Sequence, residues 1–264
     1  MKGLMERMNP LIDELVRVNE ERAAAVLVTV VDIQGARAVK AGAKCLVRDG
    51  KIQAGDLGHP PLAEAVLMEA DRRLREGKSK LVALELPASG EKAEVYFDVM
   101  LAPPRLVVVG AGHIAVPLVK FAKQMDFQVT VIDDRIQYAN RDRFPDADDI
   151  VAGDMAEALR EMPITPWTYI VLITRGHKYD EPCLREVIHS SAKYIGMIGS
   201  KRRVKACFHR FREEEKIAEE IIAKVFAPIG LDISAETPEE IALAILAEVI
   251  KVRRGGKAES LSGR

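Results

Sequence analysis

The sequence predicts an α/β fold, with a parallel sheet of strand order 3-2-1-4-5 preceded by a small α+β domain. Its 264 residues are enough for two domains. After residue 105, short apolar runs alternate with helical segments, which is typical of a parallel sheet covered on both faces. Before residue 105, helical stripes and short apolar runs separated by turn residues indicate a compact α+β unit.

The segment Ala102-Pro103-Pro104-Arg105 marks the predicted domain boundary, because consecutive prolines lack N–H donors and stiffen the chain. We expect a first domain over residues 1–101, a linker over 102–105 and a second domain over 106–254. Residues 255–264 are mostly small and polar, which predicts a disordered tail.

Cap and turn residues delimit the elements of the first domain. Asn9 and Pro10 form an N-cap and first-turn pair, and Pro60-Pro61 can open another helix. Arg48-Asp49-Gly50 is a hairpin turn. The expected elements are helices from about 10 to 20 and from 60, strands over 24–31, 81–86 and 95–101, and two short strands within 44–54.

In the second domain, apolar runs without alternation predict strands that are buried on both faces. The last helix is expected to begin at Thr237-Pro238-Glu239-Glu240, where Thr237 caps and Glu240 completes a capping box, and to end before Gly255. The five expected strands are 106–109, 128–132, 149–151, 169–173 and 194–198.

Composition excludes several classes of function. The 39 basic and 40 acidic residues balance, and the aromatic residues are scattered, so we expect no nucleic-acid partner. The longest stretch without Asp, Glu, Lys or Arg, residues 106–119, is shorter than the roughly 18–20 residues of a membrane span, so we expect no membrane association. The first residues lack a signal-peptide pattern, and we expect a cytoplasmic protein.

The three cysteines, Cys45, Cys183 and Cys207, are far apart and form no Cys-x-x-Cys pair. This spacing argues against a disulfide framework and a structural zinc site. We expect each cysteine to be a buried small hydrophobe, and we assign neither a metal site nor a catalytic residue.

The sharpest local signal is the strand-turn-helix segment Leu106–Ala115, which contains Gly-x-Gly-x-x-Ala. Gly110 permits the tight turn, and Gly112 lets a pyrophosphate approach the backbone. The pattern predicts a Rossmann-like domain whose helix starts near His113 and binds phosphate at its N-terminus. The expected binding residues are Gly110, Ala111, Gly112, His113 and Ile114. A turn retained without any ligand is the alternative.

Asp133 ends the second predicted strand, where a ribose-binding carboxylate belongs. An aspartate favours a free 2′-hydroxyl over a 2′-phosphate, although Arg135 lies close by in the sequence. We therefore include both residues in the predicted site.

Two more polar loops follow strands and open on the same edge of the sheet. Ser200 can cap a helix and leave cations facing an anion. His177 and Asp180 either face a ligand or brace their loop by a hydrogen bond. The expected ligand-binding residues of these loops are Thr174, Arg175, Gly176, His177 and Asp180, with Gly199, Ser200, Lys201 and Arg202.

Several strings together resemble the XdhC/CoxI family, the accessory proteins of xanthine dehydrogenase and related molybdenum hydroxylases. The resemblance spans about residues 24–252. It is carried by Val109-Gly110-Ala111-Gly112-His113, Val131–Arg135, Thr174-Arg175-Gly176-His177-x-x-Asp180, Gly196–Ser200, Ala227–Ile233 and Glu236–Ala242.

The resemblance implies a small N-terminal domain joined to a Rossmann domain, and a homodimer. It also implies a protein that binds molybdenum cofactor (molybdopterin), assists its sulfuration and hands it to an apo molybdenum hydroxylase, with a cysteine desulfurase as a second partner. The N-terminal half departs from the family pattern: Gly35–Ala38 and Gly58–Glu64 replace two of its turns, and Cys45 stands at a methionine position.

Two other functions use the same fold. One is an NAD(P)-dependent oxidoreductase with His177 or Lys178 as its acid or base, and the other is a nucleotide-sensing binding protein. The expected cofactor is therefore molybdenum cofactor or a dinucleotide such as NAD(P).

Overall fold

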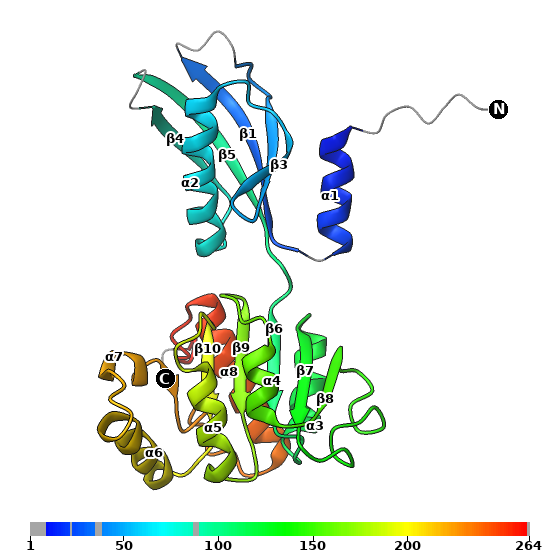
Figure 1. The fold of residues 1–264 in the computed structure, drawn as a ribbon, viewed down its shortest axis with the longest axis vertical. Helices are drawn as coiled ribbons and strands as arrows, with labels where there is room; N and C mark the ends of the chain where they lie inside the picture. Colours follow the sequence, from blue (N-terminus) through cyan, green and yellow to red (C-terminus); the bar gives the residue numbers. More distant parts are fainter. Residues whose placement is uncertain (1–8, 22, 35–38, 87–89, 263–264) are drawn as a thin grey trace, which may run out of the picture. The chain divides into compact units, whose positions relative to one another are not determined.

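The computed structural model describes residues 9–21, 23–34, 39–86 and 90–262 (Figure 1). The chain divides into two compact units, with the boundary between Pro103 and Pro104. No helix in the described ranges is both long enough and apolar enough to cross a membrane.

The first unit is a five-stranded antiparallel sheet of order β3-β2-β1-β5-β4 with a helix on each face (Figure 1). Helix α2 packs on the face that contains Val28 and Val95, and α1 packs on the face that contains Leu46. The elements are α1 (Pro10–Glu20), β1 (Ala25–Gln34), β2 (Lys44–Arg48), β3 (Lys51–Gly55), α2 (Pro60–Glu76), β4 (Lys80–Leu86) and β5 (Glu91–Met100).

The helix cap and the hairpin turn predicted for this unit are both present in the structure. Asn9 caps α1, and its Oδ1 accepts a hydrogen bond from the Leu11 N–H at 3.0 Å. The predicted hairpin is confirmed, because β2 and β3 pair and the two turn residues, Asp49 and Gly50, have φ of 52° and 71°. The departure from the family pattern at residues 35–38 lies outside the described residues.

The second unit is a six-stranded parallel sheet of order β11-β10-β9-β6-β7-β8. The predicted order of the first five strands is confirmed, and β11, which pairs with β10, was missed because two residues show no periodicity. The strands are β6 (Arg105–Val109), β7 (Gln128–Asp133), β8 (Asp149–Ala152), β9 (Thr168–Leu172), β10 (Tyr194–Met197) and β11 (Val225–Phe226).

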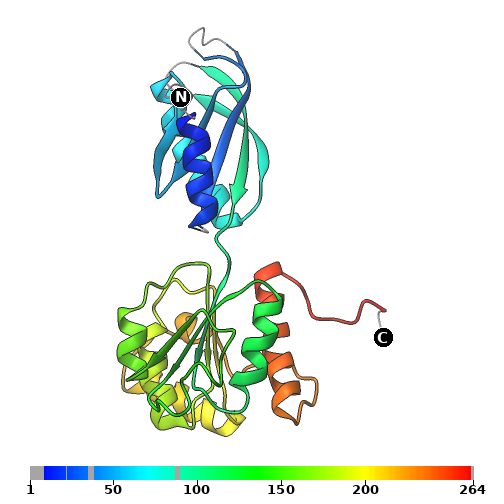
Figure 2. The same ribbon diagram turned by 90° about the vertical axis from the view of Figure 1, so that its right-hand side faces the viewer.

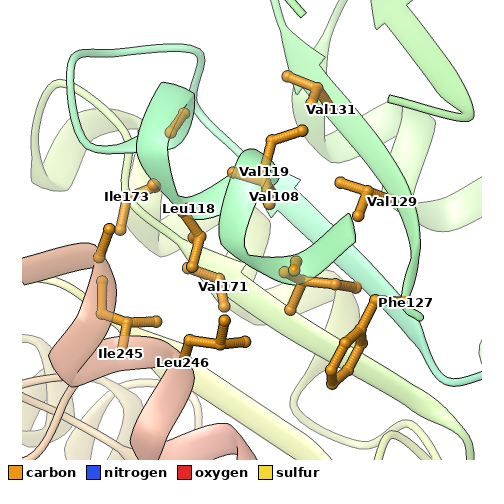
Figure 3. Close-up of a cluster of buried hydrophobic side chains, with 14 of the residues drawn as sticks. Val108, Leu118, Val119, Phe127, Val129, Val131, Val171, Ile173, Ile245 and Leu246 are labelled. Carbon is orange, nitrogen blue, oxygen red and sulfur yellow. The ribbon is translucent and has the colours of Figure 1, made fainter. Parts of the chain in front are cut away.

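Helices cover both faces of this sheet, as Figure 2 shows. On one face, Leu118 of α3 and Leu246 of α8 pack over Val108 and Val171 (Figure 3). On the other, α4, α5 and α6 cover Val107 and neighbouring side chains. The helices are α3 (Ala115–Gln124), α4 (Met155–Glu161), α5 (His177–Val187), α6 (Lys201–Glu213), α7 (Glu219–Ile222) and α8 (Pro238–Arg254).

Two helix starts were predicted from local signals. The capping box of α8 is confirmed: the Thr237 side chain accepts from the Glu240 N–H, and the Glu240 side chain accepts from the Thr237 N–H. Helix α3 begins at Ala115 rather than near His113, because residues 112–114 form a bend and turn before the helix. The disordered tail stays a prediction.

Candidate functional site

The turn after β6, residues Gly110–Ile114, is the centre of the candidate site; we call it the β6 turn. Gly110 has φ of +105°, and a Cβ there would lie 2.5 Å from the Ile173 carbonyl oxygen. Only glycine fits, since both the backbone angle and the neighbouring loop exclude a side chain. Gly112 differs, because no heavy atom lies within 4 Å of its Cβ position. The space beside the Gly112 backbone is therefore open.

The β6 turn also contains N–H groups without an acceptor in the described part of the chain. No side chain caps α3. The N–H groups of Gly112, His113 and Ile114 find no acceptor among the described residues. Free N–H groups and the positive end of the helix dipole attract anions. The β6 turn therefore has the donors that a phosphate group needs.

Asp133, at the end of β7, directs its carboxylate at the β6 turn. Oδ2 accepts from the Ala111 N–H at 2.8 Å, and both oxygens accept from Arg135 side-chain nitrogens at 2.8 and 2.9 Å. Oδ1 also accepts from the Arg135 N–H at 3.0 Å. Burial raises the pKa of Asp133, but these donors outweigh burial and lower it to about 2. Four donors occupy the carboxylate, so a ribose hydroxyl would have to displace one of them.

Asp134, the next residue, pairs with Arg175 in the loop after β9. Two guanidinium nitrogens of Arg175 lie 2.6 and 2.7 Å from the two Asp134 carboxylate oxygens. The guanidinium carbon also lies 3.7 Å from the centre of the Tyr179 ring, a cation–π contact. Asp134 received no predicted role, because its partner is distant in the sequence.

Hydrogen bonds between Asp180 and Thr174 stabilise the loop after β9. Asp180 Oδ1 accepts from the Thr174 hydroxyl at 2.6 Å and from the Thr174 N–H at 3.3 Å. The bracing partner is thus Thr174 and not His177, which is exposed at the first position of α5. Asp180 is 5% exposed, and burial raises its pKa to about 6.

A pocket of about 180 Å³ lies between the starts of α5 and α6; we call it the α5–α6 pocket. It joins residues from two of the predicted loops. Its walls include Thr174, Arg175, Gly176, His177 and Asp180 together with Met197, Ile198, Gly199, Arg203, Val204 and Cys207.

The α6 side of the pocket differs from the expectation. Ser200 caps α6 by accepting from the Arg203 N–H at 3.3 Å. Lys201, Arg202 and Arg203 are all exposed, but of these three only Arg203 lines the pocket. The apolar stripe Val204, Cys207 and Phe211 reveals which face of α6 turns inward, and that signal could have excluded Arg202, which lies on the opposite face.

A further segment, Ala227–Ile233, lies beside the end of β10. The Ile229 N–H donates to the Met197 carbonyl at 3.0 Å, and the Gly230 N–H donates to Glu248 of α8 at 3.0 Å. This segment helped to carry the family resemblance but received no site role.

The cysteines are buried and free, and burial raises the pKa of each thiol to about 12. A thiol of that pKa is protonated at neutral pH and is a poor nucleophile. The described residues contain no cluster of three or more His, Cys, Asp or Glu side chains able to hold a metal ion.

A parallel sheet whose first strand leads through Gly-x-Gly into a helix defines a protein of the Rossmann class. The chain belongs to the XdhC/CoxI family. Residues 106–249 match the XdhC Rossmann domain, and residues 19–85 match the XdhC and CoxI family.

Two curated proteins are similar to this chain. The chain is 29% identical over 254 residues to the uncharacterized protein YqeB of Escherichia coli K12, covering 92% of this chain and 46% of YqeB. It is 29% identical over 184 residues to a probable xanthine dehydrogenase subunit of Bacillus subtilis 168, covering 70% of this chain and 53% of that protein. The chain thus spans about half the length of the curated relatives it matches.

One solved structure shares the fold along the whole chain. It is a Bacillus halodurans protein described as a xanthine dehydrogenase, with a TM-score of 0.54 and 21% sequence identity. The match covers 97% of this chain and 99% of that one.

Proposed function

We propose that this protein is an accessory factor of a xanthine dehydrogenase-type molybdenum hydroxylase. It binds molybdenum cofactor, assists its sulfuration and hands it to the apo-enzyme. The observation that carries the proposal is the β6 turn, which combines open space at the Gly112 Cβ position with three N–H groups that have no acceptor in the described part of the chain. Molybdenum cofactor carries a phosphate or a nucleotide diphosphate on its pterin, and such a group matches these donors.

The remaining residues fit an organic cofactor better than a bare metal ion. Gly112, His113 and Ile114 would hold the phosphate, and the α5–α6 pocket, which follows the neighbouring strands β9 and β10, offers a small, partly apolar recess at the same edge of the sheet. The bound group would bring the molybdenum centre that the hydroxylase needs. This chain would contribute donors for the phosphate end and no cluster of metal ligands from its described residues.

The cysteines bear on the source of sulfur. Because all three thiols are buried and protonated, none is suited to carry a persulfide. We propose that a cysteine desulfurase supplies the sulfur and that this protein, as a homodimer, holds the cofactor during transfer.

The test compares wild type with Gly112→Val, both purified from cells that make molybdopterin. We expect acid extracts of wild type to contain a fluorescent oxidised pterin and extracts of Gly112→Val to contain at least tenfold less. Gly256→Val is the matched control, since Gly256 also has free space at its Cβ position but lies beyond α8. Extracts that contain a nicotinamide dinucleotide and no pterin would favour the alternative function, an NAD(P)-dependent oxidoreductase. Equal pterin in all three proteins would reject the β6 turn as the binding site.

A further inference from the structure

The Arg175–Asp134 pair spans the strand that leads into the β6 turn. In the sheet, β6 lies between β9 and β7, and Val109 at the end of β6 is aligned with Leu172 and Ile132 on either side. Asp134 directly follows β7, and Arg175 lies three residues after Leu172. Since parallel strands lie about 4.8 Å apart, the pair bridges a gap of roughly two strand spacings at the carboxyl end of β6.

That gap is where a phosphorylated ligand on a Rossmann sheet lies, because such ligands bind in the crevice where the strand order reverses. The Arg175 guanidinium is a donor of the kind that binds phosphate, and it is held there against the Tyr179 ring. Its donors, however, point at Asp134 in the bidentate geometry that a phosphate would otherwise take.

Arg135 lies near this ion pair but does not replace Arg175 as the partner of Asp134. Arg135 is engaged by Asp133, and its Nε lies 3.9 Å from the Asp134 carboxylate. Both members of the pair are about one-third exposed, so an incoming anion can reach them.

We propose that Asp134 is an internal competitor for the ligand's phosphate, and that binding at the β6 turn transfers the Arg175 guanidinium from the Asp134 carboxylate to the phosphate. This inference rests on the proposed phosphate site, and it deepens that proposal by assigning the residue that sets its affinity. Asp134 then lowers the affinity for any phosphorylated ligand until Arg175 is released. The ligand class is an organic phosphate or diphosphate.

The experiment measures binding of inorganic pyrophosphate by calorimetry at low salt. We expect Asp134→Asn to bind about three- to fivefold more tightly than wild type, the scale of a partly exposed ion pair. Arg175→Ala should bind at least about tenfold more weakly, the loss of one charge-assisted contact. In the double variant, Asp134→Asn should no longer improve binding, because the donor that it frees is absent.

Glu186→Gln is the matched control, since it removes one negative charge from another bidentate pair of the same domain, with Arg160. It should leave the affinity within twofold of wild type, and thermal melting verifies that each variant is folded. If wild type binds but Asp134→Asn binds no better, or if Glu186→Gln improves binding equally, the competitor role is rejected and the phosphate site stands. If no variant binds pyrophosphate at millimolar concentration, the phosphate site itself is rejected, and this inference is rejected with it.

Discussion

The Tyr194 hydroxyl donates a hydrogen bond of 2.6 Å to Oε2 of Glu248, a buried contact between β10 and α8. The same oxygen accepts from the Gly230 N–H at 3.0 Å. Burial and the adjacent carboxylate raise the pKa of Tyr194 well above its usual range, so the hydroxyl remains a donor. One carboxylate thus joins the strand, the last helix and the segment Ala227–Ile233.

Removing the hydroxyl should destabilise this junction. We expect Tyr194→Phe to lower the free energy of unfolding by about 1–3 kcal/mol, because the buried carboxylate loses a hydrogen bond. Urea denaturation followed by circular dichroism measures the loss. The control is Tyr96→Phe on the exposed side of β5, which should change stability by less than about 0.5 kcal/mol. Equal effects of the two substitutions would show that the Tyr194–Glu248 contact contributes nothing.

Substitutions at the two glycines of the β6 turn should differ in their effect on the stability of the folded protein. Gly110→Ala forces a side chain into a backbone with φ of +105° and against the Ile173 carbonyl. We expect it to cost at least about 2 kcal/mol of stability. Gly112→Ala meets no atom within 4 Å and should melt within a few degrees of wild type. Thermal melting of both variants checks this, and a Gly110→Ala protein as stable as wild type would contradict the described turn.

The cations at the start of α6 should differ in their effect on pyrophosphate affinity. Arg203 lines the α5–α6 pocket, so Arg203→Ala should weaken binding about tenfold, the value of one charge-assisted hydrogen bond. The double substitution Lys201→Ala with Arg202→Ala removes two positive charges, but neither residue lines the pocket. It should weaken binding less than threefold at moderate salt, since charges that do not line the pocket act only at a distance and are screened. The opposite ranking would restore Lys201 and Arg202 as direct ligand contacts.

Asp180 should make stability fall as pH rises. Its folded pKa of about 6 lies above the ordinary aspartate value of 3.8, so the folded state holds the proton longer than the unfolded state. The contribution of Asp180 to the free energy of unfolding is fully present below pH 4 and is lost as the pH rises through 6. We expect the stability of Asp180→Asn relative to wild type to improve by on the order of 2–3 kcal/mol between pH 4 and pH 7. Urea titrations at the two pH values measure it, and a constant difference would mean that Asp180 titrates normally.

Much of the fold follows from local patterns. Apolar runs without alternation identify five of the parallel strands, and the caps at Asn9 and Thr237 place two helix starts. The Gly-x-Gly pattern places the β6 turn, because the requirement for glycine at residue 110 is a local property of the backbone.

The contacts within the site could not be predicted in the same way. Arg135 and Ala111 donate hydrogen bonds to the Asp133 carboxylate. These contacts depend on how the side chains are oriented, which the spacing of residues in the sequence does not determine. The Arg175–Asp134 pair depends on the order of strands in the sheet. The choice among Lys201, Arg202 and Arg203 depends on the rotation of α6 about its axis, which only its buried stripe indicates.

The position of α8 in the chain has a consequence for biogenesis. Ile245 and Leu246 of α8 pack with Leu118 of α3, the helix that the β6 turn opens, and Glu248 holds the segment beside β10. All six strands and α3 are synthesised before α8, so a ribosome-bound chain has its glycine turn long before the helix that supports it. The helix that follows the β6 turn therefore lacks part of its packing until α8 docks, so we expect the proposed ligand site to become rigid only after synthesis of this domain is complete.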